Sequence, residues 1–143
     1  YNWYAVETGR LCPEGWHVAT EADWKQLEIA VGMPADQADT DGWRGSQAGS
    51  LAGGQELWVS GAVKHAADFG SSAFHALPAG NRLADNGLFG NTGTNAYWWS
   101  ADEYDNNSAW GWMLYYGSTR IIKSPFDKQY GFCVRCVKDQ SAR

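Results

Sequence analysis

The sequence predicts an α+β fold from three observations. Between Tyr97 and Asp139, short aromatic or β-branched runs alternate with Gly, Asn, Asp and Ser, which is typical of consecutive strands joined by tight turns. The segment from Thr20 to Val31 has the periodicity of a helix. Nine tryptophans and 17 glycines indicate many turns around aromatic packing. Because the 143 residues contain no linker or internal repeat, we expect residues 1–143 to form one domain.

The segments before the predicted helix are rich in aromatic residues. Tyr1 to Val6 is β-prone, so we expect a strand there, followed by a turn at residues 7–10. Leu11 to Val18 contains Pro and Gly and should be an extended segment. It should turn the side chains of Trp16 and Val18 towards the core.

The helix has the clearest local signals. Thr20 is a good N-cap, and Asp23 stands three residues later, at the position of the acidic partner in a capping box. The predicted apolar stripe consists of Trp24, Leu27, Ala30 and Val31. Ile29 falls outside the stripe and is expected at the flank of the helix. Gly32 should end the helix.

The middle of the chain is less regular. A short helix is expected near Asp36 to Asp39 or near Ser46 to Leu51, and Gly61 to Ser72 should be a loop. His65 and Asp68 have helical spacing within that loop. Two ligands without a third are weak support for a metal site, so we expect both side chains to be solvated.

The sheet is expected to begin with Phe74 to Arg82. Alternation along this segment should turn Phe74, Ala76 and Pro78 inward, with His75 on the surface. Leu83 to Asn95 is rich in Gly and Asn and should connect this segment to the strands that follow Tyr97.

The three cysteines are Cys12, Cys133 and Cys136. In a strand, an offset of three places Cys133 and Cys136 on opposite faces, which argues against redox or zinc use of their C-x-x-C spacing. We favour a disulfide between Cys12 and Cys136, with Cys133 free. That bond would close a very long loop and would imply an oxidising compartment. The alternative is three reduced, buried thiols in a cytosolic domain.

Composition and motifs argue against several functional classes. The net charge is -5 with a pI near 5.0, and no basic stripe exists, so we do not expect nucleic-acid binding. No apolar run approaches the roughly 20 residues of a membrane span. Catalytic Ser/His/Asp, Cys/His or paired-carboxylate motifs are also missing, so we do not expect an enzyme. The chain lacks an initiator Met and a signal peptide, and we expect it to be part of a larger protein.

Several segments in order resemble a known family. They are Tyr1 to Val6, Leu11 to Val18, Thr20 to Trp24, Phe74 to Arg82, Tyr97 to Ser100, Ala109–Trp110 and Gly131 to Asp139. This set resembles the Fibrobacter succinogenes major paralogous domain, which occurs on surface and secreted proteins of Bacteroidota and relatives. The resemblance implies a C-type-lectin-like fold with a terminal strand pair, adjacent termini, two helices and a twisted antiparallel sheet with long loops. It also implies an extracellular or cell-surface location.

The same superfamily includes the variable proteins of diversity-generating retroelements, whose ligand-facing residues lie in the C-terminal part. Two departures from family patterns matter here. The family usually has a small polar residue at the position of Cys133, which fits a spare thiol. The chain also lacks the Glu-Pro-Asn and Trp-Asn-Asp tripeptides of calcium-dependent sugar-binding lectins, which argues against calcium-dependent sugar binding.

One loop between two strands is rich in oxygen ligands. Glu103, Asp105 and Asn107, together with Asn106, are weak candidates for calcium ligands. Their spacing fits no defined calcium motif, and a solvated turn in which Asp and Asn bond their own backbone is the commoner arrangement. We therefore expect no required cofactor, with calcium as the alternative.

The C-terminal aromatic residues are the stronger candidates for ligand contact. The predicted ligand-binding residues are Trp112, Tyr116, Arg120, Phe126 and Tyr130. We assign Trp98, Trp99 and Trp110 to the core. The strand that contains Trp110 would then have to twist or end at Gly111 for Trp112 to be exposed. The polar turn from Ser124 to Lys128, with Pro125, should hold Phe126 outward.

These observations predict a non-catalytic, surface-exposed recognition domain that binds a protein or a glycan through its C-terminal sheet and loops. A retroelement variable protein is one alternative. A structural module of a larger cell-surface protein is another, and an enzyme related to the formylglycine-generating sulfatase activators is a third.

Overall fold

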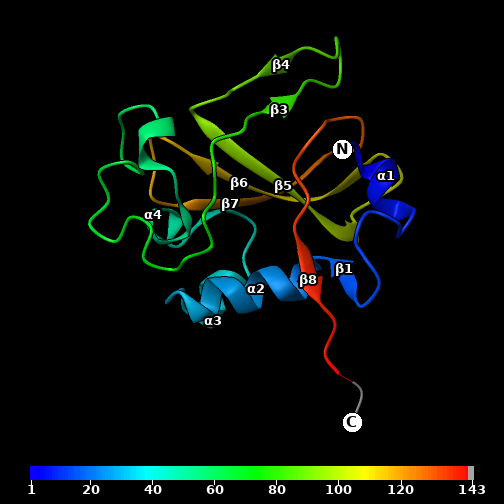
Figure 1. Ribbon diagram of the computed structural model, residues 1–143, viewed down its shortest axis with the longest axis horizontal. Helices are drawn as coiled ribbons and strands as arrows, with labels where there is room; N and C mark the ends of the chain where they lie inside the picture. The colour runs from blue at the N-terminus through cyan, green and yellow to red at the C-terminus, as the bar shows by residue number, and fades with distance from the viewer. Residues whose placement is uncertain (142–143) are drawn as a thin grey trace.

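The computed structural model describes residues 1–141 and confirms an α+β architecture with antiparallel sheets (Figure 1). The helices are α1 (Trp3–Glu7), α2 (Glu21–Ala30), α3 (Ala35–Ala38), α4 (Ala48–Leu51) and the 3-10 turn η1 (Gln55–Leu57). The strands are β1 (Trp16–Val18), β2 (Gly42–Arg44), β3 (Asn81–Arg82), β4 (Phe89–Gly90), β5 (Asn95–Glu103), β6 (Ser108–Tyr115), β7 (Ile121–Asp127) and β8 (Cys136–Lys138). No helix within residues 1–141 has the length and apolar character needed to cross a membrane.

The main sheet has four antiparallel strands in the order β2-β7-β6-β5. Strand β7 corrects the expectation of a polar turn from Ser124 to Lys128, because Ile121 to Asp127 pair with β6. Pro125 is tolerated because it lies beyond the three residues of β7 that pair with β2. The expectation that Phe74 to Arg82 begins this sheet is also wrong, since only Asn81–Arg82 is a strand and it pairs with β4 in a separate hairpin.

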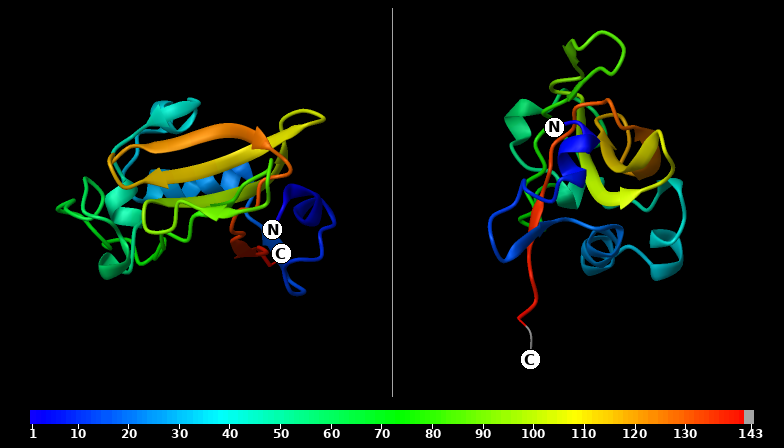
Figure 2. Two further views of the ribbon diagram at one scale, coloured as in Figure 1. Left: turned by 90° about the horizontal axis from the view of Figure 1, so that it is seen from above. Right: turned by 90° about the vertical axis from the view of Figure 1, so that its right-hand side faces the viewer.

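Helix α2 packs along one face of the main sheet (Figure 2). The predicted capping box is confirmed, because the side chains of Thr20 and Asp23 each accept a hydrogen bond from the other's backbone N–H. Trp24 stacks on Trp112 of β6 with ring centroids 5.4 Å apart. The predicted stripe is partly wrong, since Ala30 is exposed and the carboxylate residue Glu28 is completely buried in its place.

The expected strand at Tyr1 to Val6 is instead helix α1. Asn2 caps this helix by accepting a hydrogen bond from the N–H of Ala5, which offers the backbone a local alternative to a strand. Trp3 and Val6 lie one turn apart and are both buried, and the Trp3 indole N–H donates to the carbonyl of Ser100 at 2.9 Å. The aromatic run therefore follows a helical period.

The two terminal segments lie side by side. Strand β1 pairs with β8, and Val18 is buried as predicted, whereas Trp16 is 43% exposed, contrary to the expectation that it turns inward. The amino terminus of Tyr1 donates to the carbonyl of Phe132 at 2.8 Å. The predicted disulfide between Cys12 and Cys136 is present and links positions 124 residues apart, while Cys133 is free and exposed.

His17 joins the terminal strands to the start of α2. Its Nδ1 lies 2.6 Å from Asp139 and its Nε2 lies 2.8 Å from Asp23, the capping-box residue. The hydrogen bonds to Asp139 and then Asp23 raise the pKa of His17. Burial raises the pKa of Asp23, but hydrogen bonds from the Thr20 backbone, from His17 and from the Thr20 hydroxyl together lower it further than burial raises it.

This bridge predicts a pH dependence of folding stability. The folded state holds the His17 proton more tightly than the unfolded state. The contribution of protonated His17 to folding stability should therefore be complete below its ordinary pKa of about 6.5, and it should be lost as pH rises through the higher pKa of the folded protein. The effect should be small, roughly 0.2–1 kcal/mol, since water screens the partly exposed His17 and Asp139 side chains. Urea denaturation of wild type and His17→Gln between pH 5 and 8.5 measures it. A constant difference between the two proteins across that range would contradict the prediction.

The middle of the chain forms both of the short helices that were offered as alternatives, α3 and α4. Gly61 to Ser72 is a loop, as expected, and His65 bonds the Ser60 hydroxyl at 2.9 Å there. In the segment before β3, Ala76 and Pro78 are buried and Phe74 is half-buried, which confirms their inward alternation.

Both faces of the main sheet carry a core. Successive residues of β5 point to opposite sides, so Trp98 belongs to the core beneath α2 while Trp99 belongs to a second core. Both are buried, as predicted. The second core also contains Trp3, Tyr97 and Phe132, and it lies against the β5 side of the sheet.

Candidate functional site

The second face of the main sheet becomes progressively more exposed away from β5. Pairing aligns Tyr97, Met113, Ile122 and Trp43 in one row across the four strands. Tyr97 is 8% exposed, Met113 and Ile122 are half-buried, and Trp43 is 38% exposed. We call the half-buried to exposed part of this face the open sheet face; Met113 and Phe126 form its border with the second core. Its residues are Trp43, Met113, Tyr115, Ile122, Ser124 and Phe126.

Contacts within the open sheet face hold its rings in place. Trp43 meets Tyr115 edge to face with centroids 6.2 Å apart. The exposed Arg120 donates a guanidinium N–H to the carbonyl of Trp43 and so ties β2 to the turn before β7. The ring of Phe126 lies over Gly111, where an added Cβ would come within 2.8 Å of the ring. A larger residue at position 111 would therefore force the Phe126 ring to move.

Of the predicted ligand-binding residues, Trp112 lies in the core and not on the surface as expected. It is 1% exposed and faces α2, not solvent. Strand β6 neither ends at Gly111 nor twists there enough to turn Trp112 outward. Residues 110–112 pair with β7 in unbroken register. Period-two alternation then places Trp110 and Trp112 on the same side, and Trp110 is half-buried against the same core.

The other four predicted residues do not form one cluster. Tyr116 is half-buried against the core beneath α2, beside Gly61. Tyr130 stacks on Phe132 in the second core at 5.8 Å. Phe126 also packs on this core and is not held outward on a loop as expected. Phe126 thus belongs to the open sheet face, and Arg120 and Tyr116 touch its edge, since Arg120 bonds the Trp43 carbonyl and the Tyr116 ring meets that of Tyr115 with centroids 4.8 Å apart.

Most residues of the open sheet face are not predicted from the sequence. Trp43 belongs to a strand of three residues, and its partner β7 contains Ser124 to Asp127, for which the sequence predicts a turn. Residues 121–127 do not alternate between apolar and polar side chains, so the signal that could have found β7 is the β-branched pair Ile121 and Ile122 at its start.

A buried polar network lies on the opposite side of these strands. Arg44 donates to both carboxylate oxygens of Glu28 at 2.8 Å, and the Trp112 indole N–H donates to the same carboxylate. Burial raises the pKa of Glu28, and the charge of Arg44 opposes that shift. Beside it, Lys123 is 3% exposed, pairs with Glu21 and Asp41, and lies 4.4 Å from the Trp110 ring. The network connects α2 to β2, β6 and β7, the three strands that carry the open sheet face on their other side.

The oxygen-rich loop between β5 and β6 contains a cation from the protein itself. The ammonium group of Lys128 pairs with Glu103, donates to the carbonyl of Asn106 at 3.0 Å, and is almost completely buried. Asp105 accepts hydrogen bonds from the backbone N–H groups of Asn107 and Ser108. This is the turn in which Asp bonds its own backbone. Within residues 1–141, no three His, Cys, Asp or Glu residues are grouped to hold a metal ion.

Comparison with known proteins gives one family. The model of the Fibrobacter succinogenes major domain matches residues 1–138, almost the whole chain. No curated protein and no solved structure matches the chain.

Proposed function

Since the chain belongs to the Fibrobacter succinogenes major domain family, we propose that it is a non-catalytic recognition domain that binds a protein partner through the open sheet face. The observation that carries the proposal is the gradient of exposure across the main sheet. One side of the face is sealed by the second core, while Trp43, at the far end of the same row, is 38% exposed. An apolar sheet face of this kind is suited to contact with another macromolecule.

The chemistry of the open sheet face supports a protein ligand. Trp, Tyr and Arg dominate binding energy at protein interfaces because they desolvate a large area and still offer a directed hydrogen bond. Trp43, Tyr115 and Arg120 are held by contacts with one another, so binding would order few side chains.

The disulfide supports an extracellular or cell-surface location. Disulfides persist in oxidising compartments and are rare in the cytosol. Cys12 and Cys136 are bonded although they lie 124 residues apart in sequence. We propose that the domain is exported as part of a larger surface or secreted protein.

Photo-crosslinking on the native cell surface tests the binding face. A photoreactive phenylalanine analogue at position 122 of the full-length protein should crosslink to a partner, while the same analogue at position 88 should not. Leu88 is a matched control because it is 63% exposed in the β3–β4 hairpin, away from the main sheet (Figure 1). Trp43→Ala should reduce the yield at position 122 at least about tenfold, as expected for a hot-spot residue.

Two outcomes would contradict the proposal. Equal crosslinking at positions 122 and 88 would show that the open sheet face is not selective. Crosslinks from position 122 exclusively to other parts of the same chain would show a structural module that packs on its own neighbours.

A further inference from the structure

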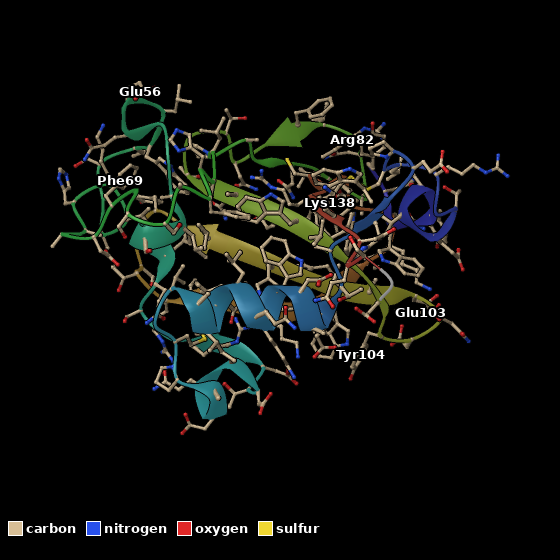
Figure 3. All side chains as sticks on the ribbon, turned by 60° about the horizontal axis from the view of Figure 1, so that its bottom comes forward. Glu56, Phe69, Arg82, Glu103, Tyr104 and Lys138 are labelled. Atoms are coloured by element: carbon tan, nitrogen blue, oxygen red, sulfur yellow. A yellow bond between two sulfur atoms is a disulfide. The ribbon has the colours of Figure 1, made fainter. Side chains whose placement is uncertain are left out.

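A groove of about 510 Å³ lies between α2 and β8, separate from the open sheet face. Its apolar walls are formed by Trp24 and Leu27 of α2, by Phe74 and by Val137 of β8. Lys138 stands at its rim, and Figure 3 shows this residue on β8 beside α2. The volume falls within the range of small-molecule sites, roughly 300–1,000 Å³.

The walls of the groove are rigid before any ligand binds. Trp24 is 2% exposed and packs against both Trp112 and Phe74, with ring centroids 5.4 and 5.7 Å away. The disulfide at Cys136 anchors the opposite wall to the N-terminal segment. A ligand would therefore enter a preformed site, which lowers the ordering cost of binding.

The groove carries a cation that lacks an acidic partner. The guanidinium of Arg135 lies 4.4 Å from the centre of the Phe74 ring and donates one N–H to the Phe74 carbonyl at 3.2 Å. No carboxylate of residues 1–141 lies within 4.0 Å of it or of the Lys138 ammonium. Asp23 is the acid among the lining residues, and its carboxylate is bonded to His17 and Thr20.

Two features define the chemistry of the site. Trp24, Leu27 and Phe74 line it with apolar surface, and the Arg135 guanidinium has N–H groups that make no bond within the described residues. The indole N–H of Trp24 is buried and lies out of reach of a ligand in the groove, so it takes no part in the proposal.

We propose that the groove binds a small aromatic carboxylate. The aromatic body would pack on Trp24, Phe74 and Leu27, and the carboxylate would pair with the free N–H groups of Arg135. A guanidinium fork matches a carboxylate in shape and charge. The nearby Asp23 carboxylate disfavours a dianion at the same place.

NMR titration of the disulfide-bonded protein tests the ligand class. The probes are 3-phenylpropionate, its neutral amide 3-phenylpropanamide, and phenyl phosphate. We expect saturable shifts at the amides of α2 and β8 with the acid, and binding at least about tenfold weaker with the amide. Arg135→Gln should remove the preference for the acid, and Arg135→Lys should retain part of it.

Arg120→Gln is the matched control, because it removes an exposed arginine from the other side of the sheet and should leave the titration unchanged. Absence of saturable shifts at α2 and β8, or equal binding of acid and amide, would overturn the proposal. Tighter binding of phenyl phosphate would replace the carboxylate with a phosphate. The acid–amide comparison uses the wild-type protein and is independent of crosslinking at position 122, so the two proposals can fail separately.

Discussion

Trp112→Ala should destabilise the fold by about 3–5 kcal/mol, the usual cost of removing a buried tryptophan from a core. Trp112 is 1% exposed, stacks on Trp24 and donates its indole N–H to the buried carboxylate of Glu28. The substitution removes packing and also leaves that carboxylate with one hydrogen bond fewer. Urea denaturation measures the change in the free energy of unfolding.

Two further variants separate the causes. Trp112→Phe keeps most of the ring but has no N–H, so its loss relative to wild type reports the bond to Glu28. Trp43→Ala is the matched control, since this tryptophan is 38% exposed on the open sheet face and its removal should cost much less. If Trp112→Ala changed stability no more than Trp43→Ala, the placement of Trp112 in the core would be refuted.

Glu28→Gln should also cost about 3–5 kcal/mol, because it leaves the charge of Arg44 buried without a counter-ion. Arg44 is 2% exposed, and its Nε and one terminal nitrogen already lack partners among residues 1–141. The Gln carbonyl can still accept the Trp112 N–H, so the loss should come mainly from the ion pair. Chemical denaturation at pH 7 gives the value.

The double variant Glu28→Gln/Arg44→Met is the critical comparison. It removes both charges, keeps an acceptor for Trp112 and fills the space of the arginine stem. Because no unpaired charge is then buried, the double variant should recover most of the loss. A double variant as unstable as Glu28→Gln would show that the two charges do not depend on each other.

Predictions from local signals were the most accurate. The capping box of Thr20 and Asp23 acts within three residues, so no distant contact is needed to recognise it. The pairing of Cys12 with Cys136 was also correct, because the spacing of Cys133 and Cys136 in an extended segment left one of them for a distant partner. Short-range geometry sufficed for the capping box, whereas the choice of Cys136 over Cys133 rested on its place near the end of the chain opposite Cys12.

Predictions about the candidate site were less accurate. The side of the sheet on which a side chain lies depends on how the strands pair. Whether Trp112 lies inside or outside follows from an unbroken register with β7, a strand whose second half the sequence predicts as a turn. Glu28 occupies a position of the α2 stripe where an apolar residue is expected, and its burial is tolerable because Arg44 and the Trp112 indole N–H, both distant in sequence, bond its carboxylate.

By itself, the sequence determined the α+β class, the start of α2 and the family, because these depend on neighbouring residues or on segments in a recognisable order. It favoured the disulfide over three reduced thiols, and the structure contains that bond. Only the tertiary structure decided that α1 is a helix, that Trp112 is core and that Trp43 is exposed on the open sheet face. A strand has two equivalent sides, and contacts with partners far along the chain decide which side is covered.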